Sequence, residues 1–308
     1  MGAQGWRVAV IIPAFRSERT IAGCLEALRG QTFKDYRTVV VDSSPDQLAE
    51  QVVRNGYPEV EYHHAPERLL PHAARNLGVE RSISELLVFT DPDIYPAKEW
   101  LTELVEGYDR NQGVIVGTVA CHNRDRLSRW IHLAKFDMWL PGGHISPVEI
   151  SLTGNMLIDR STFRQVGGLD GERMLADTLL SWCLESHGIT KTLVPAALVA
   201  HDHSQTFVYF LRERLVRGHE FGKLRMSWNQ WSIGRVLAQL VLSLVPLRLI
   251  RLTFRSLSNA WRHVPPQRAL AALPVVVCGQ AAWLLGEAWA YSAHILGQPL
   301  EADLPCAS

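Results

Sequence analysis

The sequence predicts an α/β protein with a doubly wound, mostly parallel sheet and a C-terminal helical appendage. Short apolar runs alternate with amphipathic segments through the first part of the chain. Two of these runs end directly at aspartates, Asp42 and Asp91, where a buried strand is expected to stop. The last third is dominated by long aliphatic stretches. Strand and helix patterns that alternate in this way are typical of a parallel sheet covered by helices.

The short apolar runs are interpreted as strands because each is bounded by polar or turn residues. The expected strands are Val8–Ile12, Thr38–Val41, Val60–Tyr62, Glu85–Phe89, Gly113–Val119, Leu152–Ile158 and Lys191–Val199, the last broken at Pro195. Between them, apolar side chains recur at helical spacing. The expected helices are Glu18–Leu28, Gln47–Asn55, Pro71–Ser82, Trp100–Tyr108, Leu127–Met138 and Thr178–Ser186.

Composition bounds the class of protein. A chain of 308 residues, 47% of them hydrophobic, has enough apolar side chains for one large domain with an appendage, or for two domains. The 31 basic and 31 acidic residues balance, so nothing favours nucleic acid as a partner. None of the five cysteines forms a Cys-x-x-Cys pair, so a zinc ribbon is not indicated.

The segment Leu86–Asp93 carries the strongest chemical signal. Its apolar run ends at Asp91-Pro92-Asp93, and ligands of open α/β sheets bind outside the carboxyl ends of the strands. Two neighbouring carboxylates repel unless a positive charge lies between them, and Mg²⁺ binds carboxylates together with substrate phosphates. The pair therefore indicates a metal–diphosphate site. The alternative is an ordinary turn, in which Asp and Pro are favoured.

Several motifs together resemble one enzyme family. In chain order they are VAVIIPAFRSERTIAGCLEALRGQTF, VVVDSSPD, AARNLG, LLVFTDPDIYP, TGNMLIDRSTFRQVGGLD and ADTLLSWCLESHG. The ordered set, within residues 6–225, resembles the family 2 glycosyltransferases of bacterial type, which have a GT-A fold. The resemblance implies a donor of the UDP- or GDP-sugar type, Mg²⁺ or Mn²⁺ as cofactor, and a saccharide or lipid-linked acceptor.

By this resemblance, one group of residues binds the donor nucleotide. The group is Pro13, Ala14, Phe15, Glu18, Asp42, Arg75, Asn76 and Asp91. Glu18 is expected near the ribose, and Asp42 can accept an N–H of the base. Asp42 could instead cap the next helix, and Arg75 could instead form a structural ion pair.

The resemblance also implies a metal site. Asp93 is the expected direct ligand, while Asp91 holds the ribose or a metal-bound water. His201 matches the downstream histidine that completes the coordination, with His203 as its competitor and a satisfied surface histidine as the alternative. The ion neutralises the departing nucleoside diphosphate.

Asp177 is the expected general base on the acceptor hydroxyl, and Gly154 and Asn155 are expected on the acceptor side. The family's usual Glu before this Asp is replaced by Ala176. The alternative role for Asp177 is the N-cap of the helix that follows. One base, an assisted leaving group and no enzymatic nucleophile imply an inverting, single displacement. A sugar-phosphate nucleotidyltransferase and a non-catalytic nucleotide-sugar-binding relative remain as alternatives.

The expected division is a GT-A domain over 1–225 and an apolar helical region over 226–308. Val236–Ile250 is interrupted by Pro246, and Ala269–Leu296 by Gln280 and Glu287, so neither is a clean membrane span. Flanking Arg and interfacial Trp residues favour a peripheral or monotopic attachment at the cytoplasmic face of a membrane. The alternatives are a helical hairpin on the catalytic domain and a dimer contact. Arg214 and Arg217 either bind phosphate oxygens or form a solvated face.

Overall fold

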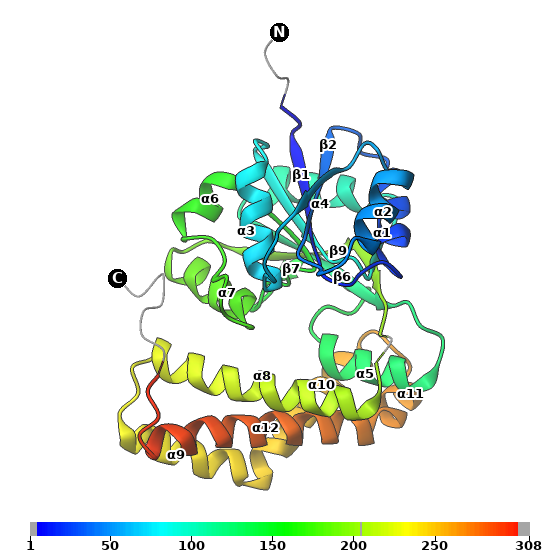
Figure 1. Cartoon of the computed structure of the whole chain (residues 1–308). Coiled ribbons are helices and arrows are strands. Elements are labelled where there is room, and N and C mark those ends of the chain that lie inside the picture. Colours follow the sequence, from blue (N-terminus) through cyan, green and yellow to red (C-terminus); the bar gives the residue numbers. More distant parts are fainter. Residues whose placement is uncertain (1–4, 204, 301–308) are drawn as a thin grey trace. The chain divides into compact units, whose positions relative to one another are not determined.

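A computed structural model describes residues 5–203 and 205–300 (Figure 1). The chain divides into two compact units. The sheet unit comprises Met1–His122 and Pro141–Asp202, and the helical unit comprises Asn123–Leu140 and His203–Ser308. The domain boundary that the sequence predicts at residue 225 stays a prediction. In the structure, helix α8 (Phe207–Trp228) lies entirely within the helical unit, as defined by the contacts inside each unit. Residues 1–4 and 301–308 of the two predicted domains lie outside the described part.

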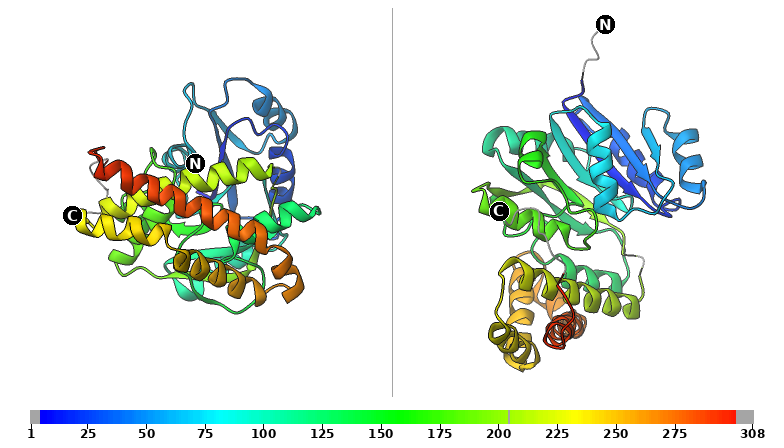
Figure 2. Two further views of the ribbon diagram at one scale, coloured as in Figure 1. Left: turned by 90° about the horizontal axis from the view of Figure 1, so that it is seen from below. Right: turned by 60° about the vertical axis from the view of Figure 1, so that its left-hand side comes forward.

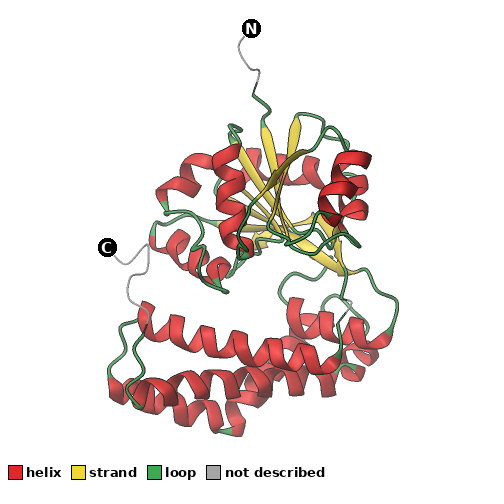
Figure 3. Ribbon diagram, in the orientation of Figure 1, coloured by secondary structure: helices red, strands yellow, loops and turns green. Residues whose placement is uncertain are grey.

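The sheet unit has the expected α/β fold, with a nine-stranded sheet among the described residues (Figure 3). The strands are β1 (Val8–Ala14), β2 (Tyr36–Asp42), β3 (Glu61–His64), β4 (Leu86–Thr90), β5 (Ile94–Pro96), β6 (Val114–Cys121), β7 (Ser146–Pro147), β8 (Asn155–Asp159) and β9 (Lys191–His201). Their order is β3-β2-β1-β4-β8-β6-β9-β5, and β7 pairs with β9. Strands β1 to β4, β6 and β9 share one direction, while β5, β7 and β8 run against it.

Helices pack on this sheet through apolar faces. They are α1 (Ile21–Arg29), α2 (Leu48–Gly56), α3 (Pro71–Arg81), α4 (Trp100–Asn111), α6 (Arg160–Gln165) and α7 (Ala176–Ser186). Helix α3 packs on β1 and β2, and α4 packs on β6, β8 and β9. Gly78 lets α3 approach the sheet closely, because a Cβ there would lie 2.5 Å from a methyl of Ile11. Strands β1 and β4 are wholly buried, so the apolar runs that predicted them form the core.

The strand directions gather the predicted site residues at one edge of the sheet. Ala14, Asp42 and His201 end β1, β2 and β9, and Asp91 follows β4. Strand β8 runs the other way, so its first residue, Asn155, pairs with the last residue of β4 at the same edge.

Strand β9 runs through to His201, but its pairing with β6 is interrupted at Pro195, where the break was expected. Gly117 pairs with Val194 and Thr118 with Leu198, so the register shifts at this point. A proline lacks the N–H that a sheet ladder needs and is tolerated at such irregularities. The Thr118 hydroxyl donates a hydrogen bond to the Pro195 carbonyl at 2.8 Å. The carbonyl therefore has a hydrogen-bond partner where the ladder is irregular.

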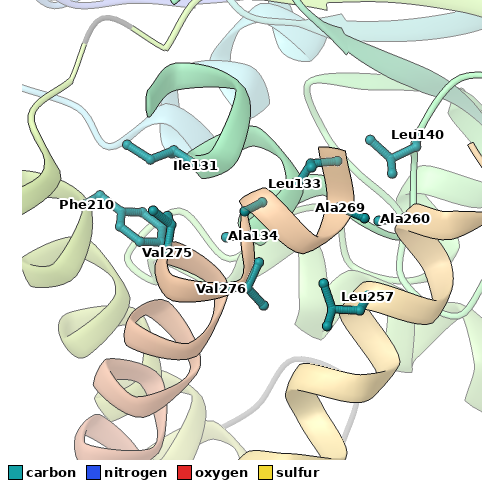
Figure 4. Packing of buried hydrophobic residues seen from close by; sticks show 11 residues of the cluster. Ile131, Leu133, Ala134, Leu140, Phe210, Leu257, Ala260, Ala269, Val275 and Val276 are labelled. Atoms are coloured by element: carbon teal, nitrogen blue, oxygen red, sulfur yellow. The ribbon is translucent and has the colours of Figure 1, made fainter. Parts of the chain in front are cut away.

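The helical unit contains α5 (Arg126–Phe136), α8, α9 (Ile233–Leu244), α10 (Pro246–Trp261), α11 (Pro266–Ala271) and α12 (Leu273–Ile295). Helices α8 and α12 run side by side (Figures 1 and 2). Glycines make this approach possible: a Cβ on Gly218 would lie 2.1 Å from the Trp283 carbonyl oxygen. One end of the unit is filled by side chains of α5, α8, α10, α11 and α12, among them Phe210, Leu257 and Val276 (Figure 4).

The two apolar stretches have different structures. The first forms α9 and α10, which meet at an angle of 69°. The second includes α12, which is long and apolar enough to cross a membrane, although half of its most apolar window is buried. Its polar residues Gln280 and Glu287 are also buried, so they face the bundle. Length and composition alone therefore leave α12 equally suited to a bundle core.

Candidate active site

Asp91 and Arg75 form the first contact of the site. Asp91 directly follows β4, and Arg75 lies on α3 with only 3% of its side chain exposed. The guanidinium group is paired with Asp91 Oδ1, and its Nη1 lies 3.3 Å from Nδ1 of His72. The ion pair considered for Arg75 is thus present, and its partner is a carboxylate of the predicted site. The buried cation partly compensates the charge of the Asp91–Asp93 pair.

Asp93 and His201 form the second contact. Strand β5 begins at Ile94 and pairs antiparallel with β9, so that Ile94 lies opposite His201. The Asp202 N–H also donates to the Asp93 carbonyl at 3.0 Å. This register places His201 Nε2 3.8 Å from Asp93 Oδ2, with 38% of the Asp93 side chain exposed. His203 instead lies in the helical unit, where its Nε2 is 2.8 Å from Nδ1 of His132.

The surroundings of the two aspartates fit a cation. Gly154 lies against Asp91, since a Cβ there would come within 3.0 Å of Asp91 Oδ2. Burial, followed by the charges of Asp93 and Asp91, raises the pKa of the Cys24 thiol. Carboxylate oxygens and an imidazole form a donor set suited to Mn²⁺-like ions. The residues present therefore match the metal that the resemblance implies.

Asp42 is fully buried and held by three donors. Its Oδ1 accepts hydrogen bonds from the Ser44 N–H at 2.9 Å and the Ser44 hydroxyl at 2.6 Å. Its Oδ2 accepts from the Tyr62 hydroxyl, and burial, then this hydrogen bond, raises the pKa of Tyr62. The alternative role as a helix cap is wrong, because the N-cap of α2 is Gln47. Asp42 instead fixes Ser44, whose hydroxyl accepts from the Arg16 N–H at 2.7 Å.

The loop after β1 presents an aromatic ring and a carboxylate. Pro13 and Ala14 are buried within β1, whereas Phe15 is 36% exposed. The Arg68 guanidinium lies 4.7 Å from the centre of the Phe15 ring. Oε2 of Glu18 is buried and has no hydrogen-bond partner among the described residues. A buried acceptor in this state is suited to a ligand hydroxyl.

Asn76 and Asn155 hold the fold together through their amides. Asn76 donates to the Leu169 carbonyl at 2.6 Å and accepts from the Leu169 N–H at 3.2 Å. Asn155 is fully buried; it accepts from the Trp100 indole at 2.7 Å and donates to two backbone carbonyls. Both amides are therefore engaged by protein groups.

Asp177 lies in the first turn of α7. The helix begins at Ala176, two residues earlier than expected, and its N-cap is Leu175, so Asp177 is not the N-cap. The carboxylate is half-buried and accepts the Thr178 N–H at 2.8 Å. The Ser181 hydroxyl donates to the Asp177 carbonyl at 2.7 Å and also accepts the Ser151 N–H at 2.8 Å. These bonds tie the first turn of α7 to the segment that leads into β8.

Two groups of this edge were not anticipated from the sequence. Tyr62 closes over Asp42, and Arg68 lies on Phe15. Tyr62 lies within β3 and Arg68 follows it, and the carboxyl end of β3 lies beside that of β2. The position of β3 in the sheet was the available signal, because ligands of α/β sheets bind where parallel strands end.

Comparison with known proteins places the chain in a family of sugar-transferring enzymes. The family model described as "Glycosyl transferase family 2" matches residues 9–174, and the chain belongs to this family. The sheet unit accordingly has the GT-A fold that the motifs implied.

The chain is also similar to individual glycosyltransferases, at low sequence identity or over part of its length. The chain is 33% identical over 99 residues to "Glycosyltransferase AglE" of Haloferax volcanii, covering 30% of this chain and 33% of the relative. It is 25% identical over 285 residues to the "Pre-mycofactocin glycosyltransferase" of Mycobacterium tuberculosis, covering 83% of this chain and 58% of the relative. The chain thus spans between a third and about three fifths of the length of these relatives.

A solved structure supports the fold. Mannosyltransferase PcManGT from Pyrobaculum calidifontis, in complex with GDP-Man and Mn²⁺, has a TM-score of 0.53 at 18% identity. The similarity covers 98% of this chain and 77% of that protein.

Proposed function

We propose that the chain is a metal-dependent, inverting glycosyltransferase that moves a sugar from a nucleotide-diphosphate sugar to a hydroxyl group. The observation that carries the proposal is the Asp93–His201 pair, set beside the Arg75–Asp91 pair where the parallel strands end. Ligands of α/β sheets bind at this edge. The family name and the nucleotide sugar and Mn²⁺ bound by the similar mannosyltransferase support it.

In the proposed mechanism, Asp93 and His201 hold a Mn²⁺ or Mg²⁺ ion, with Asp91 as a further oxygen donor. The bound ion supplies Lewis-acid stabilisation of the departing diphosphate. Arg75 orients Asp91, since its buried guanidinium leaves that carboxylate little freedom to rotate. Asp93, the more exposed carboxylate, faces the ligand.

The nucleoside of the donor, UDP- or GDP-type, lies at the ends of β1 and β2 in this proposal. Phe15 and Arg68 offer flat groups on which a base can stack. Glu18 accepts a ribose hydroxyl through its buried, unpartnered oxygen. Asp42 acts on the base indirectly, because Ser44 and Tyr62 already occupy its carboxylate.

Asp177 takes the proton of the acceptor hydroxyl as general base. Its position in the first turn of α7, next to the segment leading into Gly154, is suited to the acceptor side. A retaining enzyme would need a nucleophile that the resemblance does not supply. The test is donor turnover with a panel of UDP- and GDP-sugars and Mn²⁺, followed by proton NMR of the released or transferred sugar. Initial formation of the anomer opposite to that of the donor is expected; retention of configuration would overturn the inverting mechanism.

The proposal includes peripheral or monotopic attachment of the chain to the cytoplasmic face of a membrane. Leu247, Ile250 and Phe254 lie on one face of α10 and are 72%, 62% and 62% exposed. Arg251 and Arg255, one position further on, form an exposed row beside them. A row of Arg beside an aliphatic face is suited to an anionic membrane interface.

Flotation with liposomes containing anionic lipid tests this attachment. The substitution pair Leu247→Glu and Ile250→Glu should release the chain, because it places charges in the apolar face. Ile83→Glu, on a 74% exposed residue of the sheet unit, is the matched control and should leave flotation unchanged. Flotation of the double variant at the level of the unaltered chain would argue against this surface.

A further inference from the structure

Arg16 has a backbone conformation that its residue type rarely adopts. It lies two residues after the end of β1, and its φ of +50° falls in the left-handed region. Two other non-glycine residues among those described have a positive φ, Gln112 and Gln230, and both follow the end of a helix, where left-handed residues are common. Arg16 follows a strand, so no helix end accounts for its conformation. A strained residue persists only where its surroundings hold it, and such residues concentrate at functional sites.

A chain of hydrogen bonds holds Arg16 from the neighbouring strands. The Arg16 N–H donates to Ser44 Oγ at 2.7 Å, and the Ser44 hydroxyl donates in turn to Asp42 Oδ1 at 2.6 Å. The Tyr62 hydroxyl donates to the other carboxylate oxygen of Asp42, Oδ2, at 2.5 Å. Hydrogen bonds that are linked in this way polarise and strengthen one another. The four residues are called here the tyrosine network.

The burial of the network makes the Tyr62 hydroxyl important for Arg16. Asp42 is fully buried and Ser44 is 2% exposed, so water does not readily replace a missing partner. Without the Tyr62 hydroxyl, Asp42 Oδ2 loses its donor, and a buried carboxylate oxygen without a donor is unfavourable. The carboxylate then turns toward the donors that remain, and the Ser44 hydroxyl turns with it. The loss is therefore transmitted to the acceptor of the Arg16 N–H.

The residues on either side of Arg16 carry groups suited to a ligand. The Phe15 ring is 36% exposed, and the guanidinium groups of Arg16 and Arg68 lie 5.5 and 4.7 Å from its centre. Ser17 Oγ and Glu18 Oε2 are buried and have no hydrogen-bond partner among the described residues. Buried polar groups normally have a partner, so these two atoms indicate a ligand. Because these residues adjoin Arg16 in the chain, its φ angle sets their positions relative to β1.

We propose that Tyr62 is a positioning residue for the nucleoside of the donor. Through the tyrosine network, it holds Arg16 in the left-handed conformation. This conformation places the Phe15 ring for the base, and it places the buried oxygens of Ser17 and Glu18 for the ribose. The buried carboxylate of the network supports the loop and does not read the base. The inference deepens the proposed function and rests on it for the identity of the ligand, a nucleoside diphosphate.

Calorimetric titration of the full chain with UDP, GDP and inorganic pyrophosphate, each with Mn²⁺, tests the proposal. Tyr62→Phe and Ser44→Ala should each weaken binding of the better-bound nucleotide at least tenfold. Their affinity for pyrophosphate should change less than twofold, because pyrophosphate has no nucleoside. Tyr36→Phe is the matched control, since it removes a hydroxyl that donates to the Leu28 carbonyl at 2.6 Å at the opposite end of β2. Equal losses for nucleotide and pyrophosphate would show a general structural defect and overturn the proposal.

Two substitutions of Arg16 separate its backbone strain from its guanidinium group. Arg16→Ala and Arg16→Gly both remove the side-chain charge, but only glycine adopts a positive φ without strain. Adding Tyr62→Phe to Arg16→Ala should again weaken nucleotide binding at least tenfold. Adding it to Arg16→Gly should weaken binding less than threefold, because a glycine does not need to be held. An equal effect of Tyr62→Phe in both backgrounds would overturn the role of the strained residue.

Hydrogen–deuterium exchange of the ligand-free chain separates this inference from the proposed function. Tyr62→Phe should speed exchange of the Arg16 amide at least tenfold, and Tyr36→Phe should leave it unchanged. Unchanged exchange in Tyr62→Phe would overturn the proposal whatever the chain binds. Nucleotide-sugar turnover with an unaltered KM in Tyr62→Phe would overturn the positioning role and leave the glycosyltransferase intact. Faster exchange in a chain that binds neither UDP nor GDP would refute the proposed function and leave the tyrosine network as the support of the loop.

Discussion

Replacing Glu287 by Gln should strongly destabilise the helical unit. Glu287 is fully buried in the middle of α12. Its carboxylate accepts hydrogen bonds from Arg248 at 2.8 and 2.9 Å, Arg225 at 3.0 Å, the Trp283 indole at 2.8 Å and the Tyr291 hydroxyl at 2.8 Å. Gln keeps the shape of the side chain and removes its charge. Two arginines then face each other without a counterion.

The size of the effect follows from burial. Removing one partner of a buried ion pair costs about 3–5 kcal/mol. The Arg225 and Arg248 side chains each remain 21% exposed, so water compensates part of their charge. We therefore expect a loss of about 2–4 kcal/mol. For a unit of this size, such a loss lowers the melting temperature by about 10 °C.

Thermal unfolding followed by circular dichroism measures this loss. Glu106→Gln is the matched control, because Glu106 forms an exposed pair with Arg110 on α4, and such pairs contribute at most about 1 kcal/mol. A triple replacement of Glu287, Arg225 and Arg248 by Met should recover most of the stability, since no charge is then left unpaired. A Glu287→Gln melting temperature within about 2 °C of the unaltered chain would show that the charge of Glu287 is not needed to compensate the two arginines.

Two other substitutions test the acceptor side and the helix packing. Asp177→Asn should keep nucleotide affinity but lower transfer by about 10²–10⁴-fold in steady-state assays; a loss below threefold would leave Asp177 with a structural role only. Gly218→Ala should destabilise the chain by about 1–3 kcal/mol in urea, because its Cβ would overlap the Trp283 carbonyl. Gly234 lies on α9 with open space around it. Gly234→Ala should therefore change stability by less than about 1 kcal/mol, and it should not destabilise the chain as strongly as Gly218→Ala. Similar losses for both glycines would contradict the close packing of α8 and α12.

The strands of the sheet unit could be predicted because their signal is local. Apolar runs such as Val8–Ile12 are buried on both faces, and the observed β1 exceeds the predicted strand by only two residues. Strand β5 was missed because it has three residues, includes a proline and forms only by pairing with β9 about a hundred residues later. That same pairing sets the distance between Asp93 and His201, so no local pattern could supply it.

The details of the candidate site depended on long-range contacts in a similar way. The sequence indicated Asp42 as a base-reading carboxylate or a cap, but its burial and its bond to Tyr62 come from the neighbouring position of β2 and β3. Glu287 was noted as an interruption of an apolar stretch. Its four donors come from α8, α10 and α12, so its burial follows only from the assembled bundle.

Calorimetric titration of nucleoside diphosphate in the presence of Mn²⁺ tests the proposed metal–diphosphate site. Both UDP and GDP are titrated into the unaltered chain and into Asp93→Ala, with Glu106→Gln as the carboxylate control outside the site. We expect at least one of the two nucleotides to bind the unaltered chain in a Mn²⁺-dependent manner, and Asp93→Ala to abolish this dependence. Unchanged, Mn²⁺-dependent affinity in Asp93→Ala would contradict a metal–diphosphate site at the carboxyl end of β4.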